Sequence, residues 1–598
     1  MGLAVLYCVG LIFGAGVPAN TVDETEDVYS FEYEHLLFDE SRVHSIDIRI
    51  SEAAWQELKA TSLQKNYYDC DLVLDGETIH HVGVRTKGNS TLVQSLVKDW
   101  DLQSLVFNFG KFNKSQRYHG LDVFSVYNNA CDSSYMKEML CMDMMRRMGV
   151  PTPLCSFTAI YLNGKYIGLY TAIEGVSESF AYRNFGGTHG QLYKPEQYDI
   201  AALLRGDPTG IVINAGALGA QEDALDISDF LQADDSAVAL QYLGDDLSLY
   251  QEIWDNAVFK TGKTDQRRLV SALKRISGGE DLSESADVRE LASYFAVNVF
   301  VLNTDNYLTN MAHNYYLYEK DGVLSLIPWD YDLTLGTVGT VGNEEDISLF
   351  INTAVDTPLQ NTTLAERPML GALLSDAEGY RLYHEALQSF LDECVYSGWL
   401  DAKINQYENL IYPFLTSDET ESFIEATDSL RAFCELRTQS IQGQLDGVIP
   451  VTTSAQKQAP DLLVDASDFS CPDSGSLFDM LLDEEGGIAL EDVLERLLTQ
   501  VKLVSLFKVM RISDLKNVLA ITSGENSTLD SLVESGKIQD SDRLKGIVKQ
   551  GIWESLIPVL WIAASIVVLL ASLIIVFRYG RKRQPTAKRR KRGNAHAV

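Results

Sequence analysis

The amino-acid sequence predicts an α+β protein with a β-rich N-terminal part, a helical C-terminal part, a helical juxtamembrane stalk and one C-terminal transmembrane helix. Three observations predict this order. Alternating apolar residues and tight-turn dipeptides concentrate in residues 38–130. Apolar residues at helical spacing dominate residues 236–315 and 366–448. A run of 22 uncharged residues, 556–577, follows near the end of the chain.

The first segment of the chain is apolar and carries no charge. It ends in small residues at Val17-Pro18-Ala19, which is typical of a secretory signal cleaved after Ala19. Residues 1–19 are therefore predicted to be a signal peptide. Alternating strands then follow, with a first turn at Asp75-Gly76.

One helix and two hairpins are predicted between the strands and the helical part. Met136, Leu140, Met144 and Met148 recur at helical spacing, with Asp132 and Ser133 as a cap and Gly149 as a stop. Asn163-Gly164 and Asp321-Gly322 each lie between two β-rich runs, so each predicts a hairpin turn.

The C-terminal quarter differs in composition from the rest. Residues 450–476 are rich in Pro, Ser and Asp and predict a linker. Residues 477–555 have heptad-like apolar spacing and predict the juxtamembrane stalk. The run 556–577 is long enough to cross a bilayer, although a buried core helix is the alternative. The tail 578–598 holds nine Lys/Arg and no acid, which predicts a cytoplasmic tail with residues 20–555 on the other side of the membrane.

The charge of the chain limits its partners. The formal net charge is −35, and the basic tail makes the remainder more acidic still. Such a surface repels nucleic acid, so nucleic-acid binding is not expected. It attracts a basic partner, including a Lys/Arg-rich protein substrate; the alternative is a solvated acidic face that keeps the chain soluble.

The cysteine pattern favours no metal or redox site. Seven cysteines follow the predicted signal peptide, and none forms a C-x-x-C pair. An odd count argues against a complete disulfide framework, and a single bridge is left open.

The candidate chemistry lies in the stretch from Asp305 to Asp332. Asp305 precedes Asn310 by five residues, a hairpin follows, and Asp330 and Asp332 come directly after it. Protein kinases use this order: a catalytic Asp accepts the hydroxyl proton, an Asn five residues later binds a metal, and an Asp after a hairpin binds it too. Carboxylate and amide oxygens suit Mg²⁺ or Mn²⁺.

Other interpretations of these residues stay open. Asp305 alone is also typical of a helix cap or Asx turn, and Asp330 with Asp332 of a turn after a strand or a calcium loop. The sequence lacks a G-x-G-x-x-G loop, a V-A-I-K strand, a Walker motif, a G-x-S-x-G elbow and an H-E-x-x-H helix. His313 is expected to be a structural hydrogen-bonding residue.

Several ordered motifs resemble one family. They are "VGVRTKGNST", "YHGLDVFSVYNNACDSSYMKEML", "GVPTPLCSFTAIYLNGKYIGLYTAIEGVSESF", "GQLYKPE", "NTDNYLTNMAHNYYLY" and "PWDYDLTLG". In this order they resemble the CotH kinase family, the spore coat protein H group of atypical protein kinases. The resemblance covers roughly residues 38–447 and defines a CotH kinase-like domain at 38–449.

The resemblance implies a divergent protein-kinase-like fold that uses ATP with Mg²⁺ or Mn²⁺. It implies that Asp305 is the catalytic base and that Asp330 binds metal, with Asp332 and Asn310 as further ligands. The nucleotide contacts are less defined. For Arg85 and Lys87, the alternative is a strand charge that faces solvent. The candidates are Arg85, Lys87, Lys194, Glu174 and Glu138, with either Glu174 or Glu138 as the glutamate of a lysine–glutamate pair.

The function implied is that of a membrane-anchored protein kinase acting on Ser/Thr-type residues of secreted, coat or cell-surface proteins. Because ATP is scarce outside the cell, an extracytoplasmic site needs a compartment that supplies it. Two alternatives share the fold: a catalytically inactive cell-surface binding protein or adhesin, and a structural protein of an envelope or spore coat.

Overall fold

The computed structural model describes residues 31–88, 103–196, 212–213, 231–232, 236–309, 312–337 and 344–473. By its contacts the chain divides into Met1–Ala489 and Leu490–Val598, and all described residues belong to the first unit. None of the helices in these ranges has the length and apolarity needed to span a membrane. The predicted signal peptide (1–19), stalk (477–555), transmembrane helix (556–577) and tail (578–598) lie outside the described residues.

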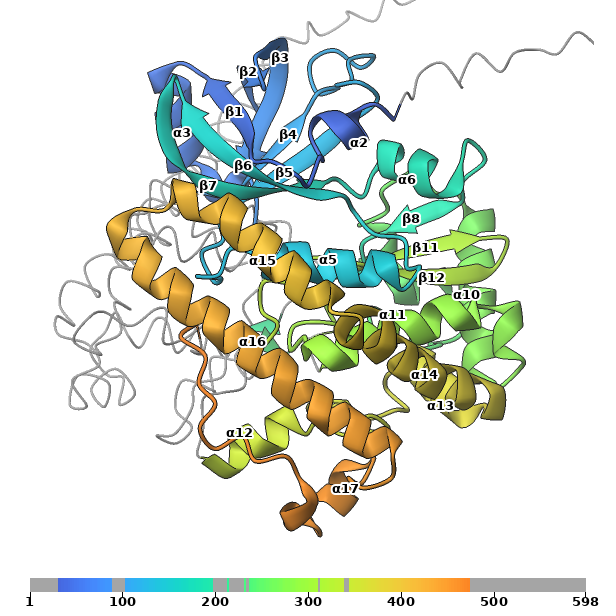
Figure 1. Cartoon of the computed structure of the whole chain (residues 1–598). Helices are drawn as coiled ribbons and strands as arrows, with labels where there is room; N and C mark the ends of the chain where they lie inside the picture. The colour runs from blue at the N-terminus through green and yellow to red at the C-terminus, as the bar shows by residue number, and fades with distance from the viewer. Residues whose placement is uncertain are drawn as a thin grey trace, which may run out of the picture. The chain divides into compact units, whose positions relative to one another are not determined.

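The N-terminal part is a closed β-barrel, which confirms the predicted β-rich character (Figure 1). Its strand order is β1-β2-β3-β4-β5-β7-β6, and β1 pairs in parallel with β6 to close it. Apolar residues that alternate along the strands, such as Ile46 and Ile48, fill the interior. The strands are β1 (His44–Arg49), β2 (Tyr68–Leu74), β3 (Glu77–Thr86), β4 (Leu105–Asn108), β5 (Val123–Tyr127), β6 (Cys155–Leu162) and β7 (Lys165–Glu174).

The predicted turns lie where the sequence places them. Both central residues have positive φ in each case, as two-residue hairpin turns require: Asp75 and Gly76, Asn163 and Gly164, Asp321 and Gly322. The third turn joins β11 (Tyr315–Lys320) to β12 (Val323–Pro328). These strands form a separate sheet of order β12-β11-β8 with β8 (Gln191–Tyr193).

Helix α5 (Lys137–Arg147) is the predicted methionine-rich helix. Its residues Lys137 to Met145 are all buried, because it packs against barrel strand β6 on one side and against helices α11 and α15 on the others (Figure 1). Asp132 accepts a hydrogen bond from the first backbone amide of the helix, Lys137 N, at 2.8 Å. Gly149, at φ +80°, ends the element as predicted.

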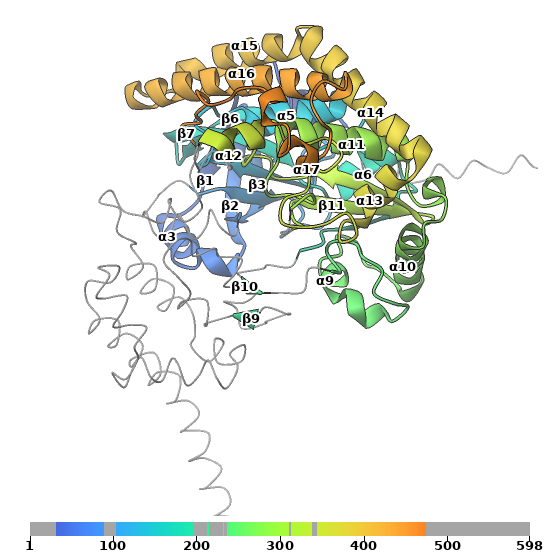
Figure 2. The ribbon, with the colours of Figure 1, turned by 90° about the horizontal axis from the view of Figure 1, so that it is seen from below.

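The C-terminal part is helical, as predicted (Figures 1 and 2). Its longest helix, α16 (Ser417–Leu445), starts with a capping box made by Thr416 and Glu419. The other helices are α9 (Gln251–Trp254), α10 (Lys263–Ser277), α11 (Val288–Val301), α12 (Glu344–Ile351), α13 (Pro368–Ser375), α14 (Ala377–Phe390), the π-helix η5 (Leu391–Tyr396), α15 (Trp399–Ile411) and α17 (Thr453–Gln456).

Shorter elements complete the described chain. They are α2 (Tyr33–Leu36), α3 (Glu52–Ala60), η1 (Ser62–Gln64), α6 (Glu178–Phe185), β9 (Val212–Ile213), β10 (Leu231–Gln232), η3 (Leu247–Tyr250), η4 (Leu282–Glu284), η6 (Tyr412–Phe414) and η7 (Pro460–Leu462). The seven cysteines in the described ranges are buried free thiols, so the bridge left open by the sequence is not formed among them.

Residues 450–473 belong to the folded unit, although their composition predicts a linker. After α17 they run back along α16 (Figure 1). Asn352 exchanges two hydrogen bonds with the backbone of Val464, at 2.9 and 3.0 Å. Three apolar residues of the segment are buried: Ala466, Phe469 and Cys471. Burial of these side chains outweighs the polar composition from which the linker is predicted.

Candidate active site

Asp305 lies in the loop that follows α11. Leu302 ends the helix with φ +48°, and Asn303 then accepts a hydrogen bond from Asp305 N at 3.0 Å. The carboxylate of Asp305 accepts a hydrogen bond from Asn314 Nδ2 at 2.8 Å. The Asx-type bonds of this loop therefore come from Asn303 and Asn306, whereas the half-buried Asp305 carboxylate points to the start of β11.

Asp330 follows β12 and bonds to the barrel. Its backbone has φ +61°, a left-handed conformation that aspartate tolerates better than most residues but that still costs free energy. Lys87, directly after β3, places its Nζ 3.3 Å from both carboxylate oxygens of Asp330. The Lys87 ammonium also lies 5.1 Å from the ring centre of Tyr127 and 5.4 Å from that of Trp329.

Asp332 and Glu138 lie deeper than Asp330, and both are buried. The hydroxyl of Tyr127, from β5, donates a hydrogen bond to Asp332. Glu138, in the first turn of α5, accepts a hydrogen bond from Tyr331 N through Oε2. Its other oxygen, Oε1, has no hydrogen-bond partner among the described residues.

The site carries more negative charge than its neighbours balance. Burial, together with Asp332 and Asp330, raises the pKa of Asp305 to about 8. Burial and the nearby Asp330 raise the pKa of Glu138 to about 8, and the same two causes raise that of Asp332 to about 6. The charge of Asp330 thus disfavours ionisation of all three of these acids, and clustered carboxylates of this kind are common at functional sites.

A second group of charges lies beside Asp330. Lys194, directly after β8, places its Nζ 3.2 Å from Glu196. Burial lowers the pKa of Lys194, but Glu196, Tyr316 and Asp330 together raise it above its usual value. Burial lowers the pKa of His313, which also faces Glu196, Lys194 and Asp330, and so keeps its ring neutral. Glu196 lies in the "YKPE" stretch, two residues after Lys194, and was not singled out from the sequence, although the two side chains pair locally.

The structure brings most predicted site residues together and commits Glu174 to other contacts. Lys87, Glu138, Asp305, Asp330 and Asp332 influence one another electrostatically, and Lys194 lies within the influence of Asp330. Arg85 donates to the carbonyl of Thr86 at 2.8 Å and lies over the ring of Tyr67. Asn310 lies outside the described residues.

Glu174 does not form the predicted pair with Lys194. It is fully buried at the end of β7, where Tyr33 donates to Oε1 at 2.6 Å and Arg183 donates to both oxygens. Leu154 N also donates to Oε2 at 3.1 Å. These four donors commit the carboxylate to joining α2, α6 and the barrel, so of the two glutamates only Glu138 lies at the site.

The donor set suits a hard divalent cation completed by phosphate oxygens. Among the described residues no three His, Cys, Asp or Glu side chains form a ready metal cluster. Mg²⁺ in phosphoryl-transfer sites is commonly held by one or two carboxylates plus substrate phosphates, so Asp330 and Asp332 are a sufficient protein contribution. The excess negative charge and the orphan Oε1 of Glu138 fit the same interpretation.

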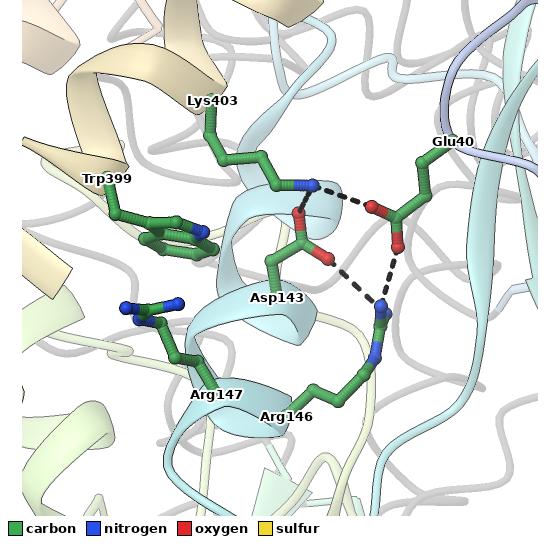
Figure 3. Close-up of a pocket in the computed structure, with 6 residues that line it drawn as sticks. All are labelled: Glu40, Asp143, Arg146, Arg147, Trp399 and Lys403. Carbon is green, nitrogen blue, oxygen red and sulfur yellow. Dashed lines mark hydrogen bonds and ion pairs between the residues drawn. The ribbon is translucent and has the colours of Figure 1, made fainter. Parts of the chain in front are cut away.

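A pocket of about 240 Å³ lies at the other end of α5 (Figure 3). Its charges balance one another: Glu40 accepts from Arg146 at 2.5 Å and from Lys403 at 2.6 Å, and Asp143 pairs with the same two cations. Arg147 stacks on Trp399, 5.0 Å from the ring centre. The network fixes the C-terminal end of α5, whereas Glu138 lies in its first turn, so this pocket is separate from the candidate site.

Comparison with known proteins shows the family of the chain. A family model described as CotH kinase protein matches residues 84–441. The chain belongs to the CotH kinase protein family. It is also 24% identical over 329 residues to the inner spore coat protein H of Bacillus subtilis (strain 168), a match that covers 52% of this chain and 76% of that protein. The matched residues of the family model include Lys87, Glu138, Asp305 and Asp330 and end within α16.

The contacts of Glu174 predict a large effect on stability. Glu174→Ala leaves the Arg183 guanidinium without its buried partner, and breaking such a pair typically costs about 3–5 kcal/mol of unfolding free energy. Glu178→Ala removes a half-exposed ion pair with Arg117 and is expected to cost at most about 1 kcal/mol. Urea unfolding of both variants measures the difference; equal losses would contradict the structural role of Glu174.

The raised pKa of Asp305 predicts a pH dependence of stability. Its folded pKa of about 8 lies above the unfolded value, so the folded state binds the proton more tightly. The resulting stabilisation is present below about pH 4 and is lost as the pH rises through about 8. Without divalent cations, the stability of the wild type relative to Asp305→Asn should fall by about 3–4 kcal/mol between about pH 5 and about pH 8. Denaturation at several pH values measures the unfolding free energy of both proteins. A difference between them that stays constant across this range would contradict the prediction.

Proposed function

We propose that this chain is a CotH-type protein kinase that transfers the γ-phosphoryl group of ATP to a Ser/Thr-type hydroxyl of a protein. The observation that carries the proposal is the position of Asp330 beside both Lys87, which pairs with it, and Asp305, whose pKa it helps to raise. The two acids precede and follow the β11–β12 hairpin, and the lysine comes from the barrel. Kinases place a catalytic-loop Asp, a metal-binding Asp and a strand lysine in this relation.

The site residues divide the work of the proposed reaction. Asp330 and Asp332, with Asn310, would hold Mg²⁺ or Mn²⁺, which supplies neutralisation of phosphate charge when bound. Asp305 orients the acceptor hydroxyl and takes its proton at a carboxylate oxygen. Because Asp332 and Asp330 contribute to its raised pKa, cationic charge beside them lowers that pKa and makes Asp305 a competent base.

Lys87 and Glu138 are proposed to form the lysine–glutamate element of the site. Burial and Asp330 raise the pKa of Glu138, and the positive charge of Lys87 partly opposes this rise, so the two side chains interact electrostatically. With ATP present, Lys87 would contact phosphate oxygens and Glu138 would keep the lysine in place, as in kinases generally. Lys194 is proposed as a second phosphate-facing cation, with Glu196 holding its ammonium.

The acceptor is proposed to be a coat or cell-surface protein with basic segments. The net charge of −35 attracts such a partner, and the printed name of the relative places that protein in the inner spore coat. The apolar run 556–577 is proposed to anchor the chain in a membrane, with the described domain on the extracytoplasmic side.

A coat or surface protein without catalysis is the second candidate function. The relative's name describes a coat protein, and the sequence lacks a glycine-rich phosphate loop. This candidate predicts that partner binding survives loss of Asp305 and that the wild type transfers no phosphate.

Asp330 should be needed for metal-dependent nucleotide binding. In calorimetric titrations with ATP, Asp330→Ala is expected to lose the Mg²⁺-dependent part of the affinity, since one of the two proposed carboxylate ligands is gone. Asp321→Asn is the matched control, because it changes an exposed carboxylate at the opposite end of the same hairpin. Metal-dependent binding that is equal in all three proteins would place the nucleotide elsewhere.

Asp305 should be needed for transfer but not for binding. Loss of a general base typically lowers the rate by about 10²–10⁴-fold, so Asp305→Asn should incorporate phosphate from labelled ATP more slowly by this factor. Its affinity for Mg²⁺ with ATP should change only a few-fold. Normal incorporation by the variant would refute the assigned role, and no incorporation by a wild type that binds its partner would favour the non-catalytic candidate.

A further inference from the structure

The residues that follow the hairpin, 330–337, must be held in place for the proposed site to work. Within the segment, Thr334 donates to the carbonyl of Tyr331 at 2.6 Å, and Leu335 N donates to Val301 O at the end of α11 at 2.8 Å. Glu138 and Tyr127 hold its beginning. The contacts at its other end come from parts of the chain far away in sequence.

Lys137 holds the last described residue of this segment. Its Nζ donates to Thr337 Oγ1 at 2.6 Å, and Thr337 in turn donates to the carbonyl of Thr334 at 2.8 Å. Lys137 is the first residue of α5 and the direct neighbour of Glu138. The side chain is 1% exposed, so its charge needs a buried partner.

Asp473 is that partner. Its Oδ2 lies 2.7 Å from Lys137 Nζ, and its carboxylate also accepts from Ser133 N at 3.1 and 3.2 Å. Asp132 is the other acid facing the ammonium, at 3.8 Å, but it is already occupied by the amides of Ser134 and Lys137. The closest charge compensation for Lys137 therefore comes from a residue 336 positions later in the chain.

A second contact joins the same two segments. Phe469 packs over Gly336, where an added Cβ would lie 3.0 Å from Phe469 Cζ. Gly336 also has φ +97°, so both space and backbone require glycine. Phe469 packs against Phe433 of α16 with ring centres 6.0 Å apart, and Ser429 donates to Ser470 O at 2.7 Å. Residues 464–473 thus form a fixed support behind residues 330–337.

We infer that Asp473 and Lys137 are positioning residues of the candidate active site, and that residues 464–473 belong to the catalytic unit. The inference rests on the proposed function. Asp473 fixes Lys137, and Lys137 fixes both the start of α5, with Glu138, and the end of the segment that begins with Asp330. These two elements supply three of the four site carboxylates: Glu138, Asp330 and Asp332. The family match ends at residue 441, so these contacts lie partly beyond it.

Asp473→Asn in the whole chain tests this inference, because it keeps the shape of the side chain and removes its charge. Two quantities are measured: the hydrogen-exchange rates of the amides in residues 330–337, and the affinity for ATP with Mg²⁺. We expect both the exchange rates to rise and the affinity to fall, each on the order of tenfold. Lys137→Met should give the same pair of effects, and the two changes combined should do no more than either alone.

Glu319→Gln is the matched control. It weakens another buried ion pair, in which Arg268 donates to Glu319 at 2.6 and 2.7 Å, at the end of β11 that is remote from Asp330. It should lower stability without changing either quantity. If Asp473→Asn does not fold, the double change Lys137→Met with Asp473→Leu removes both charges together and leaves neither unpaired. That protein should show the same raised exchange in residues 330–337.

The outcomes separate the two proposals. A wild type that binds no ATP with Mg²⁺ would refute the proposed function, and the exchange rates would still report whether Asp473 holds residues 330–337. A wild type that binds, with Asp473→Asn unchanged in exchange and affinity, would overturn the inference alone. Equal effects of Asp473→Asn and Glu319→Gln on both quantities would also overturn it, because a general loss of stability would then explain them.

Discussion

The ion pair between Lys87 and Asp330 is the contact on which the candidate site depends. It joins the barrel, which carries the lysine, to the hairpin, which carries the acid. The positive charge of Lys87 does not compensate the three further carboxylates nearby, Glu138, Asp305 and Asp332. The pKa values of these three acids are accordingly raised. A structural salt bridge is normally matched in charge, as Glu40, Asp143, Arg146 and Lys403 are. The mismatch at Asp330 is what favours a ligand-binding function.

Helix α5 links the candidate site to the rest of the domain. Its residues Lys137 to Met145 are buried, so a shift of the helix has to be taken up by the packed side chains around it. Its first turn carries Glu138 and Lys137, and its last turn carries Arg146 in the balanced network (Figure 3). In protein kinases, the position of the helix that carries the paired glutamate decides whether the site is assembled. On the proposed function, the contacts at the two ends of α5 would fix the position of Glu138.

Local signals in the sequence predicted much of the fold. Dipeptides such as Asn163-Gly164 specify their turns because few residues tolerate positive φ, and methionine spacing specified α5. The order of Asp305, hairpin and Asp330 predicted that these acids lie near one another, because a hairpin returns the chain to the place where it starts. The closure of the barrel by β1 and β6 was not predicted, since a parallel pair between distant strands has no local signature.

Which side chains pair with one another could not be predicted from the sequence. Glu174 and Glu138 are equally plausible partners for a lysine in the sequence, and only the fold shows that Arg183 and Tyr33 occupy Glu174. The packing of residues 464–473 was also missed, because a few buried residues such as Phe469 and Cys471 decide it against a polar background. The pairing of Asp473 with Lys137 was not predicted either, because only the folded domain brings these two distant residues together.

The number of protons released on ligand binding is the most direct test. On the proposed function, the carboxylates around Asp330 are held partly protonated until a metal–nucleotide complex balances their charge. Titration of the whole chain with Mn²⁺ and ATP near pH 7, in two buffers of different ionisation enthalpy, measures the protons released on binding. Because Asp305 and Glu138 both have pKa values of about 8, we expect up to about two protons to be released from the protein, and about one fewer in Asp305→Asn. Binding without proton release, or no binding at all, would contradict it.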